Sequence, residues 1–148
     1  MSRNIHQWIN DYGVSHQNKL NKKLHWICVP LIMFTLLGLL SMIKFEILSW
    51  NSNFKVSLGH ILIFFAAIFY LRLSFKISIG MIIISLFQIL IIHYLEINMT
   101  LFNLTVLYFT VFIIAWIGQF IGHKIEGQKP SFFEDLQFLL IGPAWLLS

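Results

Sequence analysis

The chain has 148 residues, of which 58% are hydrophobic and only 11% are charged, with a formal net charge of +4. Soluble domains carry about 25% charged residues, and an apolar excess of this size cannot all be buried in one small core. The basic residues lie in short segments between apolar runs, which favours the flanks of membrane helices and argues against nucleic-acid binding. A single cysteine, Cys28, excludes an internal disulfide framework.

The chain begins with a polar segment that has apolar side chains at helical spacing over Asn4–His16, which predicts an amphipathic helix on the membrane surface. Four apolar runs follow. They predict four transmembrane helices over about residues 26–43, 54–73, 77–95 and 101–122.

The last segment of the chain is too short an apolar run to cross a bilayer. Ser131 and Glu134 have the spacing of a capping box, and the apolar run 136–147 behind them is interrupted by Gly142-Pro143. We expect an interfacial or re-entrant segment there. The fold class expected is therefore all-α: a polytopic membrane helical bundle forming one domain over residues 1–148.

The distribution of Lys and Arg predicts the topology. With the N-terminus inside, eight of the ten basic residues fall on the inner side: Arg3, Lys19, Lys22, Lys23, Arg72, Lys76, Lys124 and Lys129. Both termini are thus expected in the cytoplasm, in a multi-pass protein of a bacterial inner membrane or an endoplasmic reticulum membrane. His16, His25 and His123 would then share the cytoplasmic face, with His60 and His93 towards the opposite one.

Ionisable residues at the edge of membrane spans are costly, which makes His25 and His123 candidates for function. Around the second histidine, Gln119, His123 and Glu126 lie at about 0°, 40° and −20° on a helix and share one face. A His and a Glu three residues apart suit a metal ligand with a second ligand or an orienting carboxylate. A histidine that caps a helix C-terminus has the same spacing, so both interpretations stay open.

The first polar segment gives a similar face. Asn18, Asn21 and His25 fall at about 0°, −60° and −20°, and Asn18 also suits the N-cap of the first span. His16 is nine residues from His25, about 180° away on a continuous helix. The two histidines can share a metal only if the helix breaks between them.

A conduit across the membrane should place polar groups deep in the spans. The mid-span polar inventory holds no carboxylate: Thr35, Ser41, Ser78, Ser85, Gln88, Asn103, Thr105 and Thr110. This favours a one-sided site, although a non-enzymatic metal-binding membrane protein or a small transporter remains the alternative to an enzyme.

The spacing of the polar residues resembles that of the small Mpo-like membrane proteins, a family named after a yeast 2-hydroxy fatty acid dioxygenase. The resemblance covers nearly the whole chain, although from about Lys44 to Asn98 it rests on hydropathy alone. It is carried by Tyr12, His16, Asn18, Asn21, His25, Pro30, Gln119, Phe120, Gly122, His123, Glu126, Pro130, Asp135 and Pro143.

The resemblance implies an Fe²⁺-dependent dioxygenase that acts on a 2-hydroxy fatty acid and O₂, in the lipid bilayer, and yields CO₂ and the fatty acid one carbon shorter. It implies that His16, His25 and His123 bind the metal, which would leave about three of six octahedral positions for substrate and O₂. Glu126, Tyr12 and Asn21 would act beside the ligands, fixing imidazole tautomers or handling a proton.

Overall fold

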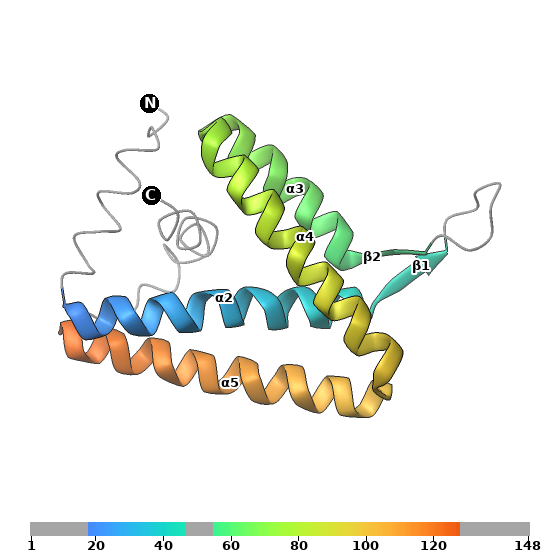
Figure 1. Cartoon of the computed structure of the whole chain (residues 1–148). Coiled ribbons are helices and arrows are strands. Elements are labelled where there is room, and N and C mark those ends of the chain that lie inside the picture. Colours follow the sequence, from blue (N-terminus) through green and yellow to red (C-terminus); the bar gives the residue numbers. More distant parts are fainter. Residues whose placement is uncertain (1–17, 47–54, 128–148) are drawn as a thin grey trace.

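The computed structural model describes residues 18–46 and 55–127, which form four helices and a two-stranded ribbon (Figure 1). The elements in chain order are α2 (Lys19–Ser41), β1 (Lys44–Glu46), β2 (Lys55–Ser57), α3 (Leu58–Leu73), α4 (Phe75–Asn98) and α5 (Leu101–Glu126). The expected interfacial helix and the C-terminal segment lie outside the described residues.

Three of these helices, α2, α4 and α5, are long and apolar enough to cross a membrane. The all-α class and a multi-pass membrane protein are thereby confirmed. The second expected span differs, because Lys55–Ser57 form a strand and α3 begins only at Leu58. With 16 residues, α3 falls below the length of about 17–25 that a spanning helix needs.

Helix α2 begins seven residues before the apolar run that starts at residue 26, and the polar residues 19–25 are helical. The side chain of Asn18 accepts a hydrogen bond from the Leu20 amide at 2.8 Å, which confirms the predicted N-cap. The helix continues through Pro30, whose carbonyl accepts a hydrogen bond from Gln88 of α4 at 3.3 Å. His25 therefore lies about two turns inside α2, on the helix that its spacing from Asn18 and Asn21 predicts.

Helices α2 and α5 run antiparallel and form the main helix pair, so that the start of α2 lies beside the end of α5 (Figure 1). Two glycines of α5 permit the close approach. A Cβ on Gly118 would lie 2.5 Å from the sulfur of Cys28, and a Cβ on Gly122 would overlap the amide oxygen of Asn21. Small residues at helix interfaces allow backbones to pack closely within a membrane, where no hydrophobic force joins them.

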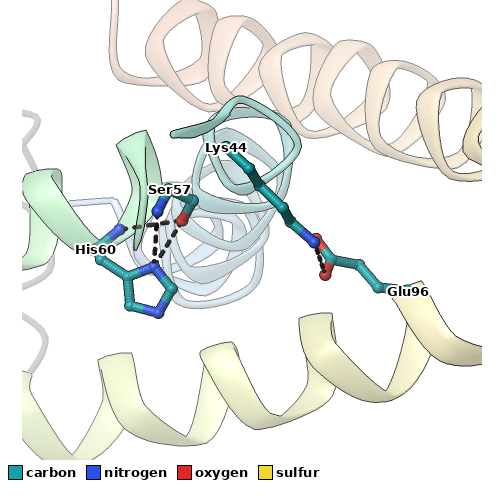
Figure 2. A network of polar contacts seen from close by, with 4 residues as sticks. All are labelled: Lys44, Ser57, His60 and Glu96. Atoms are coloured by element: carbon teal, nitrogen blue, oxygen red, sulfur yellow. Dashed lines mark hydrogen bonds and ion pairs between the residues drawn. The ribbon is translucent and has the colours of Figure 1, made fainter. Parts of the chain in front are cut away.

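The opposite end of the bundle is held by polar contacts, drawn in Figure 2. Lys44, just after α2, pairs with Glu96 near the end of α4 at 2.7 Å. Ser57 and His60 form a reciprocal capping box at the start of α3. The His60 ring and the last turns of α4, where His93 is found, thus belong to the end of the bundle away from His25 and His123.

Candidate metal centre

The two histidines of the helix pair meet. The ring centroids of His25 and His123 are 5.1 Å apart, and the ring planes are nearly perpendicular at 80°. His25 is 1% exposed, whereas His123 is half-buried. Residues almost a hundred positions apart are brought together because the first and last described helices are antiparallel neighbours.

The tautomer of His25 follows from its partner. Its Nδ1 lies 3.0 Å from the backbone carbonyl oxygen of Asn21, one turn earlier in α2. A carbonyl oxygen can only accept, so Nδ1 carries the hydrogen, and in the neutral ring Nε2 then carries the lone pair. This is the arrangement that a metal-ligating imidazole adopts, with its second nitrogen oriented by a backbone carbonyl.

Glu126 links the two helices. Its carboxylate accepts hydrogen bonds from the backbone amide of Asn18, at 3.2 and 3.0 Å to the two oxygens, and from Nδ2 of Asn21 at 2.9 Å. A carboxylate at a helix N-terminus is stabilised by the unpaired amides and the helix dipole. The last residue of α5 therefore acts as an additional cap for α2.

Asn21 lies at the centre of this arrangement and is completely buried. Its Nδ2 donates to Glu126, its carbonyl accepts from His25, and its amide oxygen packs against Gly122. Within the described residues, that amide oxygen has no hydrogen-bond partner. A side chain larger than hydrogen at position 122 would displace the Asn21 amide.

The donor chemistry fits a divalent transition metal only in part. Neutral imidazole suits iron, zinc and copper, so His25 and His123 are appropriate donors. Among the described residues, however, no group of three or more His, Cys, Asp and Glu side chains could hold a metal ion. Both oxygens of Glu126 accept hydrogen bonds from Asn18 and Asn21, which fixes the orientation of the carboxylate beside the two imidazoles.

The structure therefore brings together Asn21, His25, His123 and Glu126 from the expected site. Tyr12 and His16 lie outside the described residues. The second His-x-x-Glu pattern, His93 and Glu96, is separate from this site, since Glu96 pairs with Lys44 at the opposite end of the bundle.

The role of Gly118 was missed by the sequence analysis. Gly118 and Gly122 form a Gly-x-x-x-Gly pattern, a signal of close helix packing in membranes. Because such a pattern names no partner helix, it could have predicted a tight contact of α5 but not that the contact is with α2.

A helical membrane protein with paired histidines at one end of an antiparallel helix pair is the class that fold and site define. The chain belongs to the 2-hydroxy-palmitic acid dioxygenase Mpo1-like family, whose profile matches residues 2–148. The resemblance seen in the two polar segments is thereby confirmed. Comparison with curated proteins and with solved structures gives no significant match.

Membership of this family implies, at the level of the family, dioxygenase activity on a 2-hydroxy fatty acid and a cofactor that supports it. The chain is thus a multi-pass membrane member of a dioxygenase family.

Proposed function

We propose that this protein is an iron(II)-dependent dioxygenase that performs the α-oxidation of 2-hydroxy fatty acids. The overall reaction converts one 2-hydroxy acid and one O₂ into the acid one carbon shorter, CO₂ and water. The observation that carries the proposal is the contact of His25 with His123, at 5.1 Å, in a chain of a dioxygenase family. Iron(II), when bound, supplies the redox centre that O₂ chemistry needs.

His16, His25 and His123 are the proposed ligands. The backbone carbonyl of Asn21 supports His25 in this role, because it places the lone pair on Nε2. His16 remains the proposed third ligand, supported by the family resemblance.

Glu126 and Asn21 are proposed to hold α2 and α5 in the positions that bring the two histidines together. The hydrogen bond between them joins α5 to α2 within one turn of both imidazoles. Tyr12 is proposed to handle a proton at the same face. Lys22, Lys23 and Lys124 lie at the same end of the bundle, where their charges attract the substrate carboxylate.

We further propose that all four helices cross the membrane, with α3 as a short span and both termini in the cytoplasm. The arrangement supports this topology, since the start of α2 and the end of α5 share one end of the bundle and the β1–β2 ribbon lies at the other (Figure 1). Lys19, Lys22, Lys23 and Lys124 lie at the former end.

The proposal is tested with the purified protein in detergent or nanodiscs. Iron content is measured first, and the protein is then incubated with 2-hydroxypalmitic acid in air. We expect O₂ consumption together with release of CO₂ and pentadecanoic acid, all abolished by His25→Ala and His123→Ala and retained by His60→Ala. Bound iron without any product would instead favour a metal-binding protein.

A further inference from the structure

An aromatic ladder follows the candidate metal centre along α5. It consists of Phe112, Trp116 and Phe120, whose neighbouring ring centroids are 6.1 and 5.9 Å apart. Measured from His123, these three residues lie at about −20°, 20° and 60° around the helix, so that they share the face of the histidine. The ladder therefore leads from His123 towards the start of α5.

The ladder runs beside α2 as well. Phe112 and Trp116 pack against a buried cluster of Cys28, Ile32 and Ala115. Cys28 and Ile32 are the next buried residues after His25 on α2. The aromatic ladder and this cluster thus form one apolar surface. It runs from the histidine pair along the contact between α2 and α5, away from the charged end of the bundle.

We infer that this aromatic ladder binds the acyl chain of the 2-hydroxy fatty acid and sets the preferred chain length. The inference rests on the proposed function. A fatty acid within a leaflet holds its carboxyl group at the interface and its chain along the membrane normal. The histidine pair lies near the ends of two spanning helices, so the carboxyl end placed there directs the chain along the ladder.

The position of each ring along α5 can be compared with the length of an acyl chain. With a helix rise of 1.5 Å per residue, Phe120, Trp116 and Phe112 lie about 4.5, 10.5 and 16.5 Å along α5 from His123. An extended hydrocarbon chain advances about 1.25 Å per carbon, from a bond length of about 1.5 Å at a near-tetrahedral angle. The three rings therefore fall beside about the fourth, eighth and thirteenth carbon.

Each ring should consequently matter only for chains that reach it. Phe120→Leu should lower kcat/KM for 2-hydroxyhexanoic, 2-hydroxydodecanoic and 2-hydroxyhexadecanoic acids alike. Trp116→Leu should affect mainly the two longer acids, and Phe112→Leu only the longest. Loss of the ring contacts should change kcat/KM by about threefold to tenfold in each affected case.

Ile114→Ala is the matched control, since Ile114 is 61% exposed and lies about 180° from His123 on the same helix. It should leave the chain-length profile unchanged. Thermal melting of every variant in the same detergent separates a loss of packing from a loss of chain selectivity, because packing alone lowers the rates for all three acids equally.

A second measurement does not depend on turnover. 2-Hydroxyhexadecanoic acids that carry a diazirine near the fourth or the thirteenth carbon are photolysed with the protein in nanodiscs, and the adducts are mapped by mass spectrometry. We expect labelling around Phe120 for the first probe and around Phe112 for the second, with competition by unlabelled 2-hydroxyhexadecanoic acid.

Unchanged profiles in all three ladder variants, in an enzyme that turns over 2-hydroxy acids, would overturn the inference and leave the proposed function intact. Labelling that spreads evenly over α3, α4 and α5 and is insensitive to competition would show that the probes dissolve in the lipid and do not bind along the ladder, which would also overturn the inference. Absence of any turnover in the wild-type protein would instead contradict the proposed function itself.

Discussion

The side-chain amide of Asn21 donates a hydrogen bond of 2.9 Å to the carboxylate of Glu126, across 105 residues of sequence and between two antiparallel helices. The same asparagine holds His25 through its carbonyl, and Glu126 is three residues from His123. These four residues form one contact network, in which α2 and α5 each supply one histidine and one residue that binds the other helix.

The first prediction concerns the carboxylate of Glu126 in this network. Glu126→Leu removes the acceptor for Asn18 and Asn21 and should cost about 1–3 kcal/mol of unfolding free energy. Glu126→Gln keeps one carbonyl acceptor and should cost less, with a loss of about 10–100-fold in iron affinity or activity. Thermal melts and iron titrations measure both effects.

Glu96→Gln is the control for these substitutions, because Glu96 forms its partly exposed ion pair with Lys44 at the other end of the bundle. We expect it to change stability by less than about 1 kcal/mol and to leave iron binding unaltered. Equal losses of iron from Glu96→Gln and Glu126→Gln would argue against a local role for Glu126.

The second prediction separates helix packing from the site. Gly118→Ala and Gly122→Ala both insert a methyl group into the α2–α5 interface and should each destabilise the protein by about 1–3 kcal/mol. Only Gly122→Ala displaces the Asn21 amide and should also weaken iron binding. Iron stoichiometry measured below the melting temperature of both variants tests the distinction.

The third prediction orders the ligands. His25→Ala and His123→Ala should remove most bound iron, since each takes away one of the two imidazoles that meet at 5.1 Å. His16→Ala should be as severe, and Asn21→Ala should be intermediate, with a loss of about 10–100-fold. Full iron content and turnover in His16→Ala would exclude the three-histidine site.

A fourth prediction uses the remaining histidines as internal controls. His60 belongs to the capping box of α3, and His93 lies near the end of α4, both at the opposite end from His25. His60→Ala and His93→Ala should keep iron and most activity. Loss of iron from a folded His93→Ala variant would show that our proposal places the metal at the wrong end of the bundle.

The fifth prediction tests the membrane topology. A glycosylation or cysteine-accessibility reporter at residues 51–53 should be found on the side opposite to a reporter at the C-terminus. Both reporters on one side would mean that the four-span proposal fails, with α3 as the first helix to be reconsidered because it has only 16 residues.

Helical periodicity was sufficient to predict which helix faces carry the residues of the candidate site. The phases of Asn21 and His25 placed both on one side of α2, and both are buried there. The N-cap at Asn18 followed from local hydrogen bonding, which short polar side chains favour at a helix start. Local rules of this kind depend on residues within one or two turns of each other.

Pairings between distant residues could not be predicted in the same way. The capping of α2 by Glu126 depends on the antiparallel packing of two helices, which a hydropathy pattern does not encode. The apolar runs also do not coincide with the helix bounds, since α2 starts before its run and α3 starts inside its run. Lysines 19, 22 and 23 extend a helix past its apolar part, because long basic side chains reach towards water. Residues 55–57 pair as a strand in spite of their continuity with an apolar run.

The antiparallel pairing of α2 with α5 also has a consequence for biosynthesis. Its histidines come from the first and the last described helices, so the proposed iron centre cannot assemble until α5 has left the ribosome and entered the membrane. Nascent chains and products truncated before residue 123 would lack one histidine of the proposed iron centre. Oxygen chemistry would therefore be confined to molecules whose synthesis has reached the far end of α5.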